Sequence, residues 1–240
     1  MVWKRFQGLC RDKSRNPPQN KRMVFRGWVL YGVMMMGLHG QWFVGAGAGV
    51  STLSADGQTR IDNAATAISL YKPENGPSAH TFIGRQVSNY FSLQGSYTWN
   101  RNALSLTGSR VANGVEATYQ QNYRSRSHSA AGEGLLYFRP RASRFRPYLS
   151  GGFGLVNFNA TAGAVTVSKG PVQLPAPTFK DTRPFWRTTV GIDIQIKSGF
   201  SFRYNFWETI SSNPVSKQLS PPGARSLANF QSIFSLLKSF

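Results

Sequence analysis

The chain has 240 residues, of which 40% are hydrophobic, 13% aromatic and only 15% charged. This composition excludes intrinsic disorder as the main state and allows the core of one domain, or at most two. Lys and Arg number 28 against 9 Asp and Glu, for a formal net charge of +19, and the single cysteine excludes a disulfide framework or a multi-cysteine metal site. Because the three histidines are scattered, we expect neither a metal nor a cofactor.

The first forty residues differ from the rest of the chain. Residues 1–26 hold eight Lys and Arg against one Asp, and residues 27–55 carry no charged side chain. A basic segment followed by a short apolar one is typical of a secretory signal. We therefore predict a signal peptide or basic leader over residues 1–40 and a mature domain over residues 41–240. The alternatives are an uncleaved transmembrane helix over residues 27–49, which the glycines at 45–49 disfavour, and a buried soluble segment.

Beyond residue 40 the sequence alternates between apolar and small or polar residues with the period of two that is typical of β-strands. The alternation is clearest over residues 186–196, where Trp186, Val190 and Ile194 share one face and Arg187 and Asp193 the other. The same pattern recurs over residues 42–52, 80–87, 90–99, 129–139, 145–158, 200–206 and 227–240. We therefore predict eight strands.

The connections between these strands alternate between long and short. Three are short, at residues 88–89, 140–144 and 197–199, and four are long, at residues 53–79, 100–128, 159–185 and 208–226. In an antiparallel sheet, this alternation places every long connection at one end, as in a membrane barrel with short periplasmic turns and long extracellular loops. Since a sheet in lipid must close, the sequence predicts an all-β fold: an eight-stranded antiparallel up-and-down transmembrane β-barrel.

An eight-stranded barrel has an interior that side chains can fill. On the face opposite the aromatic residues we place five charged ones, namely Glu133, Asp193, Arg187, Arg203 and Arg85. Asp193 and Arg203 flank a three-residue turn, so they should lie close together across the hairpin. Because a buried charge must pair or meet water, we predict an ion-pair network that plugs the barrel. The alternatives are the polar lining of a narrow pore and a catalytic site.

Three further motifs lie at the start, middle and end of the mature chain. They are Trp-Phe-Val-Gly-Ala-Gly-Ala-Gly-Val at residues 42–50, Arg-Pro-Tyr-Leu-Ser-Gly-Gly-Phe-Gly at residues 146–154, and a last strand with Phe230, Phe234, Leu236 and the terminal Phe240 in step. In these features the chain resembles the OmpA-like outer-membrane β-barrel family. The resemblance implies a location in the outer membrane and a structural, adhesive or weakly pore-forming role without catalysis. The last strand resembles the sorting signal that the barrel-assembly machinery reads, although Ser232 and Lys238 occupy outward positions that favour apolar residues.

Two other functions remain as alternatives. A lipid-modifying enzyme of the outer membrane would need a His and a Ser two residues apart on one strand, whereas His128 directly precedes Ser129 and so faces the opposite way. A soluble lipocalin-like barrel that binds a small ligand would place its apolar face inward, and periodicity alone does not say which face is inside. As partners we expect outer-membrane lipid and lipopolysaccharide, with the arginines at residues 139–146 near anionic headgroups, no nucleic acid, and a monomer.

Overall fold

The computed structural model describes residues 40–54, 67–72, 74–112, 115–170, 178–197, 199–213 and 226–240. The leader predicted over residues 1–40 lies, Gly40 excepted, outside these ranges and stays a prediction. No helix within the described ranges is long and apolar enough to cross a bilayer.

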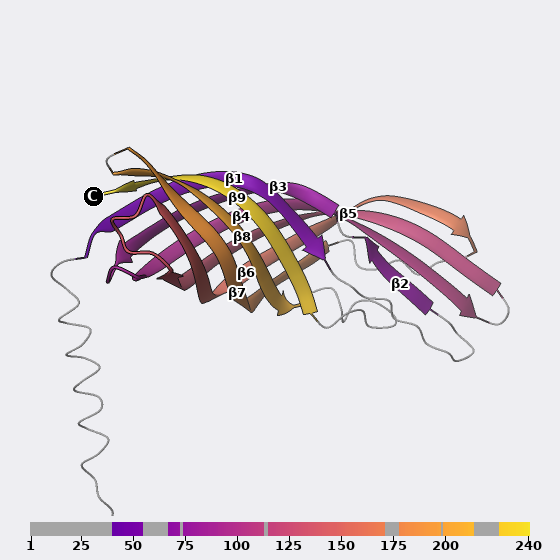
Figure 1. Cartoon of the computed structure of the whole chain (residues 1–240). Helices are drawn as coiled ribbons and strands as arrows, with labels where there is room; N and C mark the ends of the chain where they lie inside the picture. The colour runs from indigo at the N-terminus through magenta and orange to yellow at the C-terminus, as the bar shows by residue number, and fades with distance from the viewer. Residues whose placement is uncertain are drawn as a thin grey trace, which may run out of the picture. The chain divides into compact units, whose positions relative to one another are not determined.

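The described residues form nine strands, and every pairing between them is antiparallel. The strands are β1 (Trp42–Ser54), β2 (Ala67–Lys72), β3 (Glu74–Gln86), β4 (Phe91–Ala112), β5 (Val115–Tyr137), β6 (Phe145–Lys169), β7 (Thr178–Lys197), β8 (Phe200–Ser212) and β9 (Ser226–Ser239). Their hydrogen-bonded order is β2-β4-β3-β1-β9-β8-β7-β6-β5, and β5 also pairs with β4. This last pairing closes all strands except β2 into a ring (Figure 1), which confirms the predicted eight-stranded antiparallel barrel.

The first and last strands of the barrel lie side by side. β1 and β9 pair from Phe43 opposite Ser239 to Ser54 opposite Ala228. The backbone N–H of Phe240 donates to the carbonyl oxygen of Trp42 at 2.9 Å, so the terminal residue takes part in this seam. Closure leaves no row of unpaired backbone groups around the barrel wall, which is what a sheet in lipid requires. We call the end of the barrel that holds Gly40, Phe240 and the short connections the turn end, and the opposite end the loop end.

Apolar side chains cover the outside of the barrel and polar ones fill its inside. Leu93, Leu136, Phe153, Val190 and Leu236 point outward, and each is between 51% and 67% exposed. Most of the buried inward-facing residues are Ser, Thr, Asn, Gln and charged residues. A lipocalin-like barrel has the opposite arrangement, so the structure does not support the soluble alternative.

Two aromatic rings explain why glycines face inward near the turn end. Phe43 of β1 lies directly opposite Gly84 of β3, and Phe82 of β3 lies directly opposite Gly45 of β1. A Cβ atom on either glycine would collide with the ring of the facing phenylalanine. Each large ring therefore takes the space that its glycine partner leaves, and the two rings pack edge to face with centroids 6.2 Å apart.

Four strands are much longer than the sequence predicts. β7 has 20 residues, and β4, β5 and β6 have 22, 23 and 25, whereas a membrane crossing takes about 9–11. Most of the connection predicted at residues 100–128 is a paired hairpin, which continues to Ala112 opposite Val115, and β2 adds to its β4 side. β4, β5 and β6 continue past the other barrel strands at the loop end (Figure 1). The prediction was wrong here because neither face of this hairpin is apolar enough to give a period of two.

Candidate functional site

The first buried ion pair of the interior joins neighbouring strands β7 and β8. Nε and Nη2 of Arg203 donate to the two carboxylate oxygens of Asp193 at 2.6 and 2.7 Å. Nη1 donates to Oε1 of Gln94 at 2.7 Å, and Nη2 also reaches the Tyr137 hydroxyl at 3.0 Å. The guanidinium of Arg203, which is 1% exposed, also lies 4.8 Å from the ring centre of Phe82. Strands on several sides of the barrel therefore meet at one arginine.

The second buried ion pair lies further toward the loop end. Nη1 of Arg187 donates to Oε1 of Glu133 at 2.9 Å, and the hydroxyl of Ser96 donates to the same oxygen at 2.6 Å. The other nitrogens of Arg187 reach Thr209 at 3.2 Å and Ser129 at 3.4 Å. Four of the five charged residues predicted for the interior therefore lie there, in two pairs that each join side chains from different strands.

Arg85 lies elsewhere, which corrects its predicted inward position. Phe82 and Gln86 are buried on the inner side of β3, and the alternation of the strand leaves Arg85 on the outward side with Ile83. Its guanidinium stands 5.7 Å from the ring centre of Trp42, the residue opposite it on β1. Arg85 therefore stacks on an aromatic ring at the turn end and does not join the two buried pairs.

Beyond the ion pairs, small polar side chains bond across the barrel. The hydroxyl of Ser78 donates to Asn100 at 2.5 Å and lies 3.1 Å from Oε1 of Gln231. Ser51 donates to Asn229 at 2.7 Å, which joins β1 to β9. These groups satisfy one another's hydrogen bonds, and the cavity that Asn100, Asn229 and Gln231 line has a volume of only about 30 Å³.

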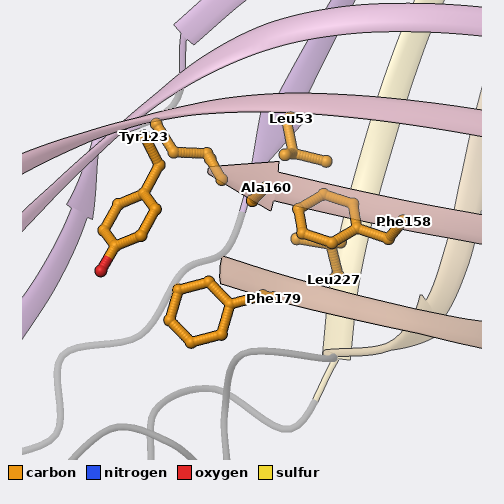
Figure 2. Close-up of a cluster of buried hydrophobic side chains, with 7 residues drawn as sticks. Leu53, Tyr123, Phe158, Ala160, Phe179 and Leu227 are labelled. Carbon is orange, nitrogen blue, oxygen red and sulfur yellow. The ribbon is translucent and has the colours of Figure 1, made fainter. Parts of the chain in front are cut away.

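An apolar cluster closes the interior at the loop end. Its buried members come from β1, β4, β5, β6, β7 and β9 and are Leu53, Leu104, Tyr123, Phe158, Ala160, Phe179 and Leu227. Figure 2 shows the rings of Phe158, Phe179 and Tyr123 gathered around Ala160 and the two labelled leucines. Sequence reasoning missed this cluster because several members fall in or beside the connections predicted as loops. The one available signal was that Phe158 and Ala160 continue the inward alternation of their strand.

Tyr123 lies on the part of β5 that extends past the barrel's apolar band. Its hydroxyl donates to Oε1 of Gln121 at 2.8 Å, and its ring packs against Phe179 with centroids 5.2 Å apart. Burial in the cluster raises the pKa of the Tyr123 phenol to about 12, because the charged form would lose its hydration. The phenol is therefore neutral at physiological pH and suits an apolar setting.

The cavities inside the barrel include two that lie at different depths. One of about 260 Å³ lies at the turn end and is lined by residues that include Arg146, Asp193 and Arg203. The other, of about 30 Å³, is lined by Ser129, Thr209 and residues nearer the loop end. The two share no lining residue. Arg187, which lines neither cavity, bonds to Ser129 and Thr209, so its ion pair with Glu133 lies between them.

The outward apolar band and the closed, polar-filled ring are the features of a membrane barrel, and a family comparison agrees. The family model described as the outer membrane protein beta-barrel domain matches residues 35–220. The chain belongs to this family. The protein is located in the outer membrane, and the OmpA-like resemblance of its sequence is confirmed. In outer-membrane barrels in general, the short turns face the periplasm and the long connections face the outside of the cell.

Several solved outer-membrane barrels are similar to this one. Neisserial surface protein A aligns with a TM-score of 0.49 at 11% identity, covering 85% of this chain and 100% of that one. Ail, the attachment invasion locus protein of Yersinia pestis, aligns with a TM-score of 0.47 at 10% identity and the same coverage. OprG from Pseudomonas aeruginosa aligns with a TM-score of 0.43 at 10% identity, covering 85% of this chain and 98% of that one. Among curated proteins there is no match.

The last strand of this outer-membrane barrel presents its predicted residues on the outside. Phe234, Leu236 and Phe240 are exposed, and Phe230, on the same face, is half-buried. The two polar residues among them have local partners: the Ser232 hydroxyl bonds to the Tyr204 hydroxyl at 3.1 Å, and the Lys238 ammonium stands 4.1 Å from the ring centre of Phe200. These contacts explain how both are tolerated on an apolar face.

The residues considered for lipid-modifying catalysis do not form a site together. His128 points outward, with Nδ1 2.6 Å from the Tyr97 hydroxyl, whereas Ser129 is buried inside the barrel against Arg187. The described ranges also hold no group of three or more His, Cys, Asp or Glu placed to share a metal ion. The arrangement of the described side chains is one that fills and braces a barrel.

Proposed function

We propose that this outer-membrane barrel acts without catalysis as a surface-interaction protein, and that it presents an extracellular sheet on a barrel closed to solutes. One observation carries the proposal. The interior is filled at successive levels by the Arg203–Asp193 pair, the Arg187–Glu133 pair and the apolar cluster, while β4, β5 and β6 continue beyond it.

The extended strands support an interaction surface. A crossing takes about 9–11 residues, so roughly half of β4, β5 and β6 stands outside the lipid. In this part β4 and β5 keep a continuous register from Asn102 opposite Ser125 to Ala112 opposite Val115. Holding so many residues in one conformation costs conformational entropy, and the gain is a surface with side chains at fixed spacings. Such a surface suits the recognition of a partner outside the cell.

The filled interior counts against the narrow-pore alternative. A solute would have to displace the Arg187–Glu133 pair, in which both side chains are at most 5% exposed. Separating a buried pair leaves two charges without compensation, which is costly. The polar groups inside the barrel therefore support a structural plug and not a lining for transport.

The same geometry supports proposals for the lipid partner, the assembly partner and the oligomeric state. Outer-leaflet lipopolysaccharide would surround the apolar band, and the barrel-assembly machinery would read the last strand with Phe230, Phe234, Leu236 and Phe240. A monomer is favoured because the closed ring of eight strands offers no free edge in the barrel wall.

An epitope tag tests which end carries the interaction surface. We would insert the tag between Ala112 and Val115, where β4 meets β5, and as a matched control in the β5–β6 turn beside Arg141. On intact cells, antibody should label the first protein only, and permeabilised cells should label both. Labelling of the turn variant alone on intact cells would overturn the proposal.

A further inference from the structure

Four cations stand on the outward side of the sheet where it leaves the apolar band. They are Arg101 on β4, Arg124 and Arg126 on β5, and Lys180 on β7, and all four are exposed. We call these four residues the cationic ledge. None of them makes an ion pair within the described part of the chain.

The strand register brings the ledge residues into one row. Arg101 lies directly opposite Arg126, Arg126 opposite Asn159 of β6, and Asn159 opposite Lys180. Arg124 lies one outward position further along β5, diagonal to Arg101. Side chains directly opposite each other in an antiparallel sheet have Cβ atoms only about 5 Å apart, so two facing arginines repel.

Nothing on the same surface neutralises this repulsion. The outward positions within residues 97–103, 124–130, 155–161 and 178–184 of the four strands carry no carboxylate. Asp181, the acid nearest in sequence to Lys180, takes an inward position and pairs with Arg183 at 2.5 Å. A like-charged pair without a counterion in the protein is stabilised by an anion from outside.

The ledge lies at the height of lipid headgroups. The next outward row toward the membrane holds Trp99 and His128, and the row after that holds Tyr97 and Leu155. Each row is about 7 Å along the strand from the next, so the cations stand just beyond the aromatic girdle that marks the lipid–water interface.

We propose that the cationic ledge binds the phosphate groups of lipid A in the surrounding outer leaflet. This rests on the extracellular orientation used in the proposed function. Lipid A carries phosphates at the two ends of its disaccharide, and guanidinium groups bind phosphate through paired, charge-assisted hydrogen bonds. Arg101, Arg124 and Arg126 would hold one phosphate, and Lys180, about 10 Å from Arg126 across two strand spacings, would reach the other.

Native mass spectrometry of the full chain in a neutral detergent tests this inference. The probes are bisphosphorylated lipid A, its monophosphorylated form and phosphatidylcholine. The Arg101→Gln/Arg126→Gln variant should lose at least about tenfold in affinity for bisphosphorylated lipid A, with a smaller loss for the monophosphorylated form. Arg139→Gln/Arg141→Gln removes the same charge from exposed arginines at the turn end, which we expect near anionic headgroups on the opposite face of the membrane, so its loss of affinity for lipid A should be much smaller.

Each variant is first checked for a heat-dependent gel shift, which reports a folded barrel. Should Arg101→Gln/Arg126→Gln not fold, Arg124→Gln/Lys180→Gln replaces it, with the same expected direction. Equal lipid A affinity in folded ledge and control variants would overturn the inference. Tighter, ledge-dependent binding of a soluble sulfated oligosaccharide would overturn it in favour of a glycan partner. The epitope experiment is unaffected by either result, so failure of the ledge leaves the proposed function standing.

Discussion

At the scale of single residues, Arg203 shows how a charge can be kept inside a barrel. It is 1% exposed, yet each of its three nitrogens donates a hydrogen bond, and its plane lies near the rings of Phe43, Phe82 and Tyr148. Such an arrangement offsets the desolvation of the guanidinium only while all partners are present. Arg203 therefore ties β8 to β4, β5 and β7 through contacts that a smaller apolar residue does not make.

Removing one partner of the Arg203–Asp193 pair should lower the free energy of unfolding far more than removing both partners. Arg203→Met leaves Asp193 buried without its counterion, and we expect it to lower the free energy of unfolding by about 3–5 kcal/mol. Arg203→Met/Asp193→Leu should recover most of that loss. Urea unfolding in detergent micelles, followed by tryptophan fluorescence, measures both.

The exposed Arg141→Met serves as the control, and its change should stay below about 0.5 kcal/mol. If the single Arg203 variant unfolds at the same urea concentration as the parent chain, the pair does not brace the barrel.

Single residues also show what the sequence could predict about the interior and what it could not. The Asp193–Arg203 contact was predictable because a short turn and a period of two place both residues inside one hairpin. For Arg187 and Glu133, the sequence could predict only that both side chains face inward. It could not predict their pairing, because β7 and β5 are not neighbours and no local rule joins them. Arg85 was misplaced because its strand holds too few apolar residues to mark which face is inside.

At the scale of elements, the loop end of the barrel departs most from expectation. The outer halves of β4 and β5 carry too few apolar residues on either face to give a period of two. Hydrophobic periodicity therefore does not reveal them, even though their backbones pair throughout. The apolar cluster that they help to cover was hidden for the same reason, because Phe158 and Phe179 come from segments that reach into a predicted loop.

Titration of Tyr123 tests whether this cluster is formed in solution. The folded-state pKa of about 12 lies above the unfolded value of about 10, so the stabilisation is complete below pH 10 and is lost as the pH rises toward 12. Among the late-ionising phenols that absorbance near 295 nm reports, the one with a midpoint near pH 12 should disappear in Tyr123→Phe. A Tyr97→Phe control, which changes an exposed phenol, should leave the late step in place. If the ionisation step near pH 12 persists in the Tyr123→Phe variant, that result would contradict a buried cluster.

At the scale of the whole molecule, one set of contacts closes the barrel wall and another fills its interior. The β1–β9 seam and the β4–β5 pairing remove free edges from the wall, and two buried ion pairs with an apolar cluster occupy the interior. What stays available for partners is the outside: an apolar band for lipid, the cationic ledge above it, and the extended sheet beyond. We therefore assign the protein's interactions to its outer surface.

Single-channel recording in planar bilayers tests whether this outer-membrane barrel is closed to solutes. The purified full chain should insert and show no conductance above the bare membrane. Steady, uniform conductance steps from the unaltered protein would contradict the account and make the polar interior the lining of a pore.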